Sequence, residues 1–466
     1  MTLEKNITGA VNDKAVKKEE VLNNTTQTRR ILSEKLVKDL MKVLNEVHNK
    51  NLSLRFWKIV LKPYLTAAIS GKKVLEKENL NLIPHLIPIN AIGSLTAQKK
   101  FEANLIRYVK HFKTFFEAGN IEKIISGNNN LLLTFPELGD IKRKLGTELP
   151  TRYPLFTGKK NKSARERANN IAEKQSDVFL KNAIKQLPQI YLEYFDSLFD
   201  SIKLINPKEK IFHIHSLQST YMDFLIAKYI ENGAKLYWYQ HGGCYGEYAF
   251  HSSHQAESDL ADEFRTWGWK IRENDVPWKA YRLEKFKQNY DSIKAGIKYD
   301  ILLCFTIIYP GNREFLVEKT KQLLSQLDKN KYKTFLARPR PTNKIRSFKH
   351  YIDFIDDPKV EKDSGLTNMT QVVKESKLVF QFEVPSTNFL ECIYIDHPVI
   401  GYLTNTENPS EIVKPHYEFL LKNGVLHTSF DSLISHLNNI DVDTWWSELI
   451  AKPEYISFKN TFAKKV

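Results

Sequence analysis

The chain has 466 residues, 42% of them apolar, and a formal net charge of +15. This length suits two or three domains with a large core, and a charge spread along the whole chain singles out no one partner. No stretch approaches the roughly 18 apolar residues of a membrane helix, the N-terminus lacks the apolar region of a secretory signal, and three scattered cysteines argue against a disulfide framework, so we expect a cytoplasmic protein.

The N-terminal part of the chain is predicted to be helical. Residues 1–27 carry no periodic apolar residues and are expected to form a flexible leader. Apolar residues at helical spacing predict helices over 29–49 and 51–69, with a break at Pro63, and a long polar helix is predicted over 163–188.

A further predicted helix, 99–116, mixes lysine and arginine with aromatic residues. Such a helix can rest on anionic lipid, which would make the protein peripheral to the inner membrane. The alternative is a core helix with a solvated basic edge.

The pattern changes near residue 203. Short apolar runs at 209–216 and 234–243 flank an amphipathic helix at 221–235. This strand–helix–strand order predicts a parallel sheet, and residues 270–298 are interpreted as a connection.

From residue 299 on, strands and helices alternate regularly, which predicts a second doubly wound α/β domain. The predicted elements are strands at 299–308, 332–339, 376–382 and 397–403, and helices at 313–329, 366–376 and 386–395. We therefore expect an N-terminal helical and α/β domain over 28–290 and a C-terminal α/β domain over 291–440. A last helical segment, 441–466, is expected to pack back on the first domain.

The sharpest local feature follows the strand that ends near Tyr239. Three glycines, Gly242, Gly243 and Gly246, allow the close approach of a ligand, and the carboxyl ends of strands are where open α/β sheets bind ligands. His241 can donate to a phosphate or shuttle a proton, and Glu247 can act as a base. The alternative is a glycine-rich turn with a structurally bonded histidine.

Two more candidate segments follow predicted strands. Ser386 or Thr387 can cap the next helix, whose N-terminus suits a diphosphate, and Glu391 can accept hydrogen bonds from a ribose diol. The alternative is an ordinary cap with an exposed helix acid. Arg338 and Arg340, held by prolines, form a plausible phosphate clamp or, alternatively, a solvated turn.

Other polar residues are weaker candidates. His213 and His215 face one side of a strand, but no carboxylate or cysteine spacing supports a metal site, and none is expected. Glu257, Asp259 and Asp262, in the run 251–270, are additional base candidates. Trp267 and Trp269 are interpreted as core residues.

The segments LRFWKIVLKPYL, YQHGGCYGEY, TWGW, LARPR and PSTNFLE and the closing WW together resemble a transferase family of bacterial O-antigen and other surface-polysaccharide gene clusters. The resemblance covers most of the chain after about residue 28. More distantly, the C-terminal half is similar to GT-B nucleotide-sugar transferases, in which two Rossmann-like domains face each other. Cys244 departs from the pattern, because a third glycine is expected there.

The resemblance implies a fold class and a function. The fold would be α/β, with two facing Rossmann-like domains and a helical N-terminal extension. The C-terminal domain would hold a nucleotide-sugar donor through donor-binding residues Arg338, Arg340, Pro385, Ser386, Thr387, Asn388 and Glu391. The N-terminal domain, with Gln240, Gly242 and Gly243, would face the transferred sugar and a saccharide or lipid-linked saccharide acceptor.

The mechanism expected from these residues is metal-independent glycosyl transfer without a cofactor, the nucleotide sugar being a substrate. The helix that begins near Ser386 and the two arginines would stabilise the leaving nucleotide. His241 would contact the donor phosphate or sugar, and Glu247 or an acid in 257–262, such as Asp259, would be the base. One alternative is a nucleotide-sugar epimerase. A basic nucleic-acid-binding protein is a further alternative, but no such module is recognisable and nucleic acid is not expected as a partner.

Overall fold

The computed structural model describes residues 28, 30–70, 124–133, 147–148, 159–217, 220–305, 310–340, 352, 355–363, 367–403 and 409–465. The chain divides into two compact units. Unit 1 consists of Met1–Phe135, Lys142–Tyr237 and Asp259–Asp262, and unit 2 of Pro136–Ile141, Trp238–Ser258 and Glu263–Val466. The leader expected at 1–27 and the basic helix expected at 99–116 lie outside the described residues.

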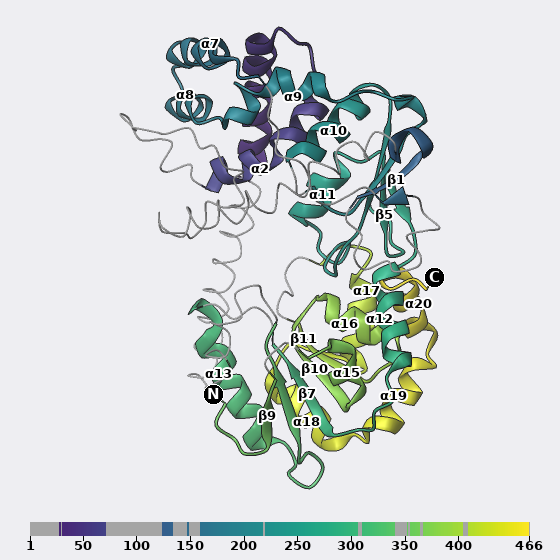
Figure 1. Ribbon diagram of the computed structural model, residues 1–466. Coiled ribbons are helices and arrows are strands. Elements are labelled where there is room, and N and C mark those ends of the chain that lie inside the picture. Colours follow the sequence, from purple (N-terminus) through teal and green to yellow (C-terminus); the bar gives the residue numbers. More distant parts are fainter. Residues whose placement is uncertain are drawn as a thin grey trace. The chain divides into compact units, whose positions relative to one another are not determined.

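Unit 1 begins with helices (Figure 1), and aromatic side chains pack between them. A helix at 30–48 precedes α2 (Leu54–Ser70), and three more follow: α7 (Lys162–Glu173), α8 (Val178–Lys185) and α9 (Phe195–Ser201). The rings of Phe56, Trp57 and Phe195 lie in mutual contact and are fully buried. Burying large side chains of this kind contributes about 1.5–3 kcal/mol each, which explains why these helices associate.

Two predictions in this part were wrong. The helix α2 runs through position 63 without a break, because its flanking residues Val60, Leu61, Tyr64 and Leu65 are buried and their burial offsets the roughly 3 kcal/mol that an internal proline costs. The single helix expected over 163–188 is two helices. Asp177 separates them, because its carboxylate accepts hydrogen bonds from the backbone N–H groups of Phe179 and Leu180 and starts α8.

The first sheet has the strand order β2-β1-β3-β4-β5-β6. Along the chain this is the order 2-1-3-4-5-6, which begins as in the flavodoxin-like doubly wound fold. The helix α10 (Thr220–Glu231) connects β3 to β4, as predicted. The strands are β1 (Asn130–Leu133), β2 (Thr147–Glu148), β3 (Ile211–Ile214), β4 (Lys235–Tyr239), β5 (Glu263–Thr266) and β6 (Asp275–Pro277).

The second sheet, in unit 2, has the order β12-β11-β10-β7-β8-β9, and its neighbouring strands are parallel. Numbered from β7, the order is 3-2-1-4-5-6, that of the Rossmann fold. The point at which the order reverses lies between β7 and β10. The strands are β7 (Tyr299–Cys304), β8 (Phe335–Arg338), β9 (Val360–Lys362), β10 (Ser376–Val384), β11 (Val399–Leu403) and β12 (Leu426–His427).

Helices cover both faces of this sheet (Figure 1). Alternate strand residues such as Ile301, Leu303, Phe380 and Phe382 form one core with α13 (Pro310–Gln326) and α18 (Phe430–Asn439), because successive strand side chains point to opposite faces. The helix α12 (Tyr281–Ser292) contacts both α15 (Met369–Lys374) and α16 (Thr387–Tyr394), and α15 and α16 each contact β10. The segment 270–298 is thus more than a connection, since it contains β6 and α12.

The C-terminal residues form α19 (Val442–Ile450) and α20 (Pro453–Phe462). They follow α17 (Lys414–Lys422) and α18, and the ammonium of Lys459 forms an ion pair with Asp396 at 2.6 Å. The backbone N–H of Lys464 donates to the carbonyl of Trp267. The domain boundaries expected from the sequence stay predictions.

The fold class is confirmed as mixed α/β with two parallel sheets. The period-2 runs and intervening helices that predicted it are local features, which explains why they could be recognised in the sequence. In the part of the chain that the structure describes, no helix combines the length and the apolar character needed to span a membrane.

Candidate functional site

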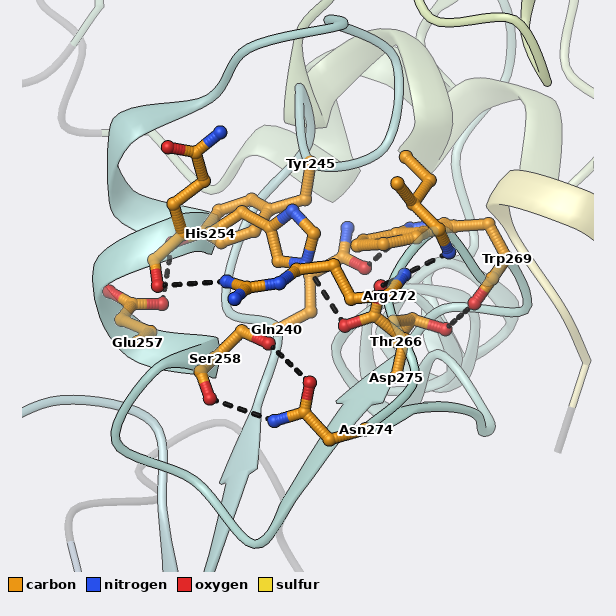
Figure 2. Close-up of polar contacts among 12 residues, drawn as sticks. Gln240, Tyr245, His254, Glu257, Ser258, Thr266, Trp269, Arg272, Asn274 and Asp275 are labelled. Atoms are coloured by element: carbon orange, nitrogen blue, oxygen red, sulfur yellow. Dashed lines mark hydrogen bonds and ion pairs between the residues drawn. The ribbon is translucent and has the colours of Figure 1, made fainter. Parts of the chain in front are cut away.

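The glycine-rich loop begins at the carboxyl end of β4, where Gln240 fixes its start. The Gln240 side chain is 5% exposed. Its oxygen accepts from the backbone N–H of Trp267 and from the indole N–H of Trp269, both at 2.9 Å, and its amide donates to the carbonyl of Gly242 at 2.8 Å (Figure 2). Both tryptophans are 2% exposed and belong to the core, as predicted. Gln240 therefore ties the loop to β5 and the turn after it.

Two glycines bring the loop against the start of α16. The backbone N–H of Gly243 donates to Thr387 Oγ1 at 2.8 Å. A Cβ on Gly243 would lie 2.6 Å from the carbonyl carbon of Ser386 and from the nitrogen of Thr387, closer than atoms tolerate, and one on Gly242 would meet Thr387 Oγ1 at 3.3 Å. Position 243 therefore requires glycine for close backbone approach.

Cys244 occupies the position where a third glycine was expected. Its φ is +74°, in the left-handed region that side chains disfavour. Two contacts hold it there: its thiol donates to the carbonyl of Pro385 at 3.1 Å, and its backbone N–H donates to Glu247 Oε1 at 3.1 Å. Burial raises the pKa of the Cys244 thiol, so the group stays protonated and donates.

Glu247 is buried beneath the loop, with 1% of its surface exposed. Its carboxyl group accepts from the hydroxyl of Tyr417 at 2.8 Å, while its backbone carbonyl accepts from Ser410. Burial raises the pKa of Glu247 from 4.5 to about 7, against the opposing effect of the Tyr417 and Cys244 hydrogen bonds. Glu247 thus joins the loop to α17 and to the segment after β11.

The free energy of unfolding of the Glu247→Gln variant should depend less on pH than that of the wild type. Because the folded-state pKa of Glu247 lies above its unfolded value, Glu247 stabilises the fold fully below about pH 4.5 and loses that contribution as the pH rises to about 7. The wild type should lose about 3 kcal/mol of unfolding free energy over this window relative to the variant. Urea denaturation of both proteins from pH 4.5 to 8 checks this; parallel stability curves would contradict it.

The side chain of His241 is 38% exposed, and the residue is therefore more accessible than Gln240 and Glu247 in the same loop. The hydroxyl of Tyr245 lies 3.2 Å from its Nδ1 and 3.4 Å from its Nε2. Glu257 Oε2 lies 3.9 Å from Nδ1, and the guanidinium of Arg282 donates to the His241 carbonyl oxygen at 2.9 Å. His241 is therefore positioned by contacts on its side chain and its backbone.

The helix α16 begins as predicted, with Ser386 as the N-cap. Its hydroxyl accepts from the backbone N–H of Phe389 at 3.2 Å, and the Val384–Pro385 bond before it is cis. The side-chain amide of Asn388 donates to Gln381 Oε1 at 2.9 Å, and this hydrogen bond connects α16 to β10. The start of α16 thus lies at the carboxyl end of β10, beside the point where the strand order reverses, which is where doubly wound sheets bind ligands.

Glu391, one turn into α16, is 9% exposed and pairs with Arg282, which the sequence pattern does not single out. Its Oε1 lies 3.7 Å from Nε of Arg282, which comes from α12. Because Arg282 also donates to the His241 carbonyl oxygen, one guanidinium connects α16 to the glycine-rich loop. Arg282 lies in a segment rich in basic residues, and nothing in its immediate sequence distinguishes it from its neighbours.

The two arginines after β8 have different environments. Arg338 is 5% exposed; its guanidinium forms an ion pair with Asp363 and donates to the carbonyl of Thr367 at 2.7 Å. Arg340 is exposed, and its positive charge has a small effect on the pKa of Cys244 that opposes the rise caused by burial. Arg340 is therefore better placed than Arg338 to meet an anionic ligand.

The remaining candidates lie in unit 1. Asp259 forms an ion pair with Arg30 at 3.5 Å. His213, 4% exposed, contacts the side-chain oxygen of Asn130 at 3.1 Å between β3 and β1, and His215 follows the end of β3. Within unit 2, the structure brings together Gln240–Glu247 and Pro385–Glu391.

A family model described as LIC12162 family transferase matches residues 5–72 and 71–466 of the chain. A search of the curated proteins found no match to this chain. Among solved structures, Anabaena HepE in complex with UDP-glucose is similar at 11% identity and a TM-score of 0.36, over 72% of this chain and 96% of that one.

Two further structures are similar to the chain. A glycosyltransferase from Rickettsia africae shares 14% identity at a TM-score of 0.34, over 75% of this chain and 90% of that one. MnaA of S. aureus, determined with UDP, shares 13% identity at a TM-score of 0.34, over 58% and 73%. At these identities and TM-scores, the likeness assigns no role to any residue.

Proposed function

Because the chain belongs to the LIC12162 family of transferases, we propose that it moves a sugar from a nucleotide-sugar donor onto a saccharide acceptor of a bacterial surface polysaccharide. The observation that carries the proposal is the contact between a glycine-rich loop and a helix N-terminus, two kinds of segment that commonly bind ligands in α/β proteins. The glycine-rich loop after β4 lies on the start of α16 through Gly243 and Thr387. Both follow parallel strands at their carboxyl ends.

The donor's phosphate groups would lie near the start of α16. The first turn of a helix carries unpaired backbone N–H groups and a positive partial charge, and the guanidinium of Arg340 adds a full positive charge. Arg338 would support this site indirectly, since it holds the segment after β8 through Asp363. Stabilisation of the leaving nucleotide by these groups, without a metal ion, is part of the proposal.

Among the three candidates for proton transfer we favour His241. Its side chain is partly exposed, and a base must reach the hydroxyl that it deprotonates. Glu247 is buried and its carboxyl group is bonded to Tyr417 and Cys244, so we assign it to holding the loop. Asp259 remains an alternative base. A lipid-linked acceptor, a cytoplasmic location and contact with the inner-membrane surface complete the proposal.

The Arg340→Ala variant should bind the donor nucleotide about tenfold more weakly, because one charge-assisted hydrogen bond is lost. In a thermal-shift screen of UDP, GDP, CMP and CDP, one nucleotide at 100 times its dissociation constant should stabilise the wild type by about 2.7 kcal/mol. Lys329→Ala removes an exposed charge from the loop before β8 and serves as the control. Equal shifts in all three proteins would remove Arg340 from the site.

The reaction itself is tested by product analysis. Incubation with the nucleotide sugar that binds, with and without a saccharide acceptor, should yield a glycosylated product only when acceptor is present. Conversion of the donor sugar into its epimer without acceptor would instead show a nucleotide-sugar epimerase, and no binding of any nucleotide would overturn both.

A further inference from the structure

His251 is a partly buried histidine beside the glycine-rich loop. It directly precedes α11 (Ser252–Ser258). Its ring packs against that of Tyr245, with 4.4 Å between the centroids, and lies nearly parallel to the ring of Tyr248, at 6.3 Å and 7°. The hydroxyl of Tyr245 also contacts the ring of His241, so a single tyrosine separates His251 from His241.

The hydrogen bond at Nδ1 of His251 fixes which ring nitrogen carries a hydrogen. The backbone N–H of His254 donates to Nδ1 at 3.2 Å, as it would to the side chain of an N-cap residue. An acceptor nitrogen holds no hydrogen, so in the neutral ring the hydrogen is on Nε2. Protonation would place a second hydrogen on Nδ1, facing the N–H of His254, and this hydrogen bond would be lost. The geometry therefore favours a neutral ring that donates through Nε2.

The surroundings of His251 also oppose a positive charge on its ring. Burial is the main cause that lowers its pKa, to about 4, and the charges of His254 and His241 act in the same direction. The carboxylates of this cluster have other partners: Asp275 pairs with His254 at 3.0 Å, and Glu257 accepts from a tyrosine hydroxyl at 3.0 Å (Figure 2). At physiological pH His251 is thus a neutral hydrogen-bond donor and not a base.

The donor at Nε2 is suited to a ligand of particular chemistry. Within the described residues, no group accepts a hydrogen bond from Nε2 of His251. A donor that lacks a full charge suits an uncharged oxygen, such as a hydroxyl or amide oxygen of a sugar. Phosphate oxygens are matched better by a guanidinium such as that of Arg340.

We propose that the Nε2–H of His251 binds an uncharged oxygen, of a hydroxyl or an amide group, on the sugar that is transferred. This inference rests on the proposed function, in which the donor's phosphates lie near the start of α16 and the attached sugar lies beside the loop that touches it. His251 would thereby contribute to the choice of sugar, because a site that donates to a substrate oxygen discriminates against a sugar that lacks this oxygen.

The first test needs no ligand. In the full chain labelled with ¹⁵N-histidine, the His251 ring signals are assigned by their loss in His251→Asn or His251→Gln. The neutral tautomer with hydrogen on Nε2 should predominate between about pH 6 and about pH 8, because the pKa lies well below this range. A ring that is protonated at about pH 7, or one with its hydrogen on Nδ1, would overturn the proposal.

The second test compares nucleotides with nucleotide sugars by titration calorimetry: UDP with UDP-glucose, GDP with GDP-mannose, and CMP with CMP-N-acetylneuraminate. His251→Asn keeps an N-cap oxygen for the His254 N–H and has no group in the place of Nε2. It should bind the bare nucleotide as the wild type does and the nucleotide sugar about fivefold more weakly, as expected for the loss of one neutral hydrogen bond. The control His416→Asn, which replaces a partly buried histidine of α17, should change neither affinity.

An equal loss for nucleotide and nucleotide sugar in His251→Asn, or no loss for either, would overturn the proposal. If this variant does not fold, the wild type decides. Its His251 Nε2–H signal should then shift on addition of a nucleotide sugar and not of the bare nucleotide, and identical responses to the two ligands would overturn the proposal.

The outcomes for the two proposals are distinguishable. If no nucleotide or nucleotide sugar binds, both fall. If the bound sugar is epimerised and not transferred, the proposed function falls and sugar binding by His251 stands. If His251→Asn binds the donor with wild-type affinity and transfers the sugar, the proposed function stands and this inference falls.

Discussion

Replacing Gly243 with alanine should abolish activity and lower the free energy of unfolding by about 3 kcal/mol, because the added methyl group has no room. Its Cβ would lie 2.6 Å from backbone atoms of Ser386 and Thr387 and 2.8 Å from the Ser386 carbonyl oxygen. Backbone atoms cannot move aside as a flexible side chain can. The loop must therefore separate from α16, and the hydrogen bond from the Gly243 N–H to Thr387 is lost with it.

The matched control for this prediction is Gly296→Ala. Gly296 has open space where a Cβ would be placed, so the same substitution should change stability by less than about 0.5 kcal/mol. Chemical denaturation gives the free energies, and nucleotide binding by thermal shift gives the effect on the site. A Gly243→Ala protein with wild-type stability and wild-type nucleotide binding would show that the loop and α16 do not depend on their contact.

Replacing Arg338 with alanine should lower the free energy of unfolding by about 3–5 kcal/mol, because it leaves a buried charge without a partner. Arg338 and Asp363 are each 5% exposed at the side chain, and Asp363 also accepts from the hydroxyl of Thr367. The double variant Arg338→Met/Asp363→Leu removes both charges. It should recover most of the lost stability, since apolar residues of similar volume often replace a buried ion pair without loss.

Urea denaturation of the single and double variants checks this prediction, and nucleotide binding at a temperature where all variants are folded separates two roles of Arg338. A supporting role predicts a large stability loss that the double variant reverses. Near wild-type stability of Arg338→Ala, together with lost nucleotide binding, would instead make Arg338 a direct phosphate ligand.

Several elements near the site were predictable because their signals are local. The strand that becomes β10 is rich in apolar residues, and Ser386 stands before an amphipathic segment, as an N-cap does. The rule that ligands bind at carboxyl strand ends then directed attention to Gln240–Glu247 and Pro385–Glu391. Arg282, in contrast, could not be recognised among its many basic neighbours. Its partners are distant in the sequence: the His241 carbonyl lies about 40 residues before it and Glu391 about 110 residues after it.

The roles of polar residues depended on burial and on distant partners. Glu247 follows three glycines in the sequence and has the chemistry of a base, but it is buried, and its carboxyl group accepts a hydrogen bond from the hydroxyl of Tyr417, 170 residues on. Arg338 and Arg340 look equivalent in LARPR. Only the approach of Asp363 distinguishes the buried arginine from the exposed one.

By itself, the amino-acid sequence determined the α/β class and the ends of the strands that became β4, β8 and β10, because apolar periodicity, capping residues and glycine act over a few neighbouring residues. It did not reveal β1, β2, β5, β6, β9 or β12. The tertiary structure alone decided that Gly243 meets Thr387, that Glu247 is enclosed and that Tyr245 links Glu257 to His241. These are contacts between elements, and their existence depends on how the whole chain packs rather than on any local preference.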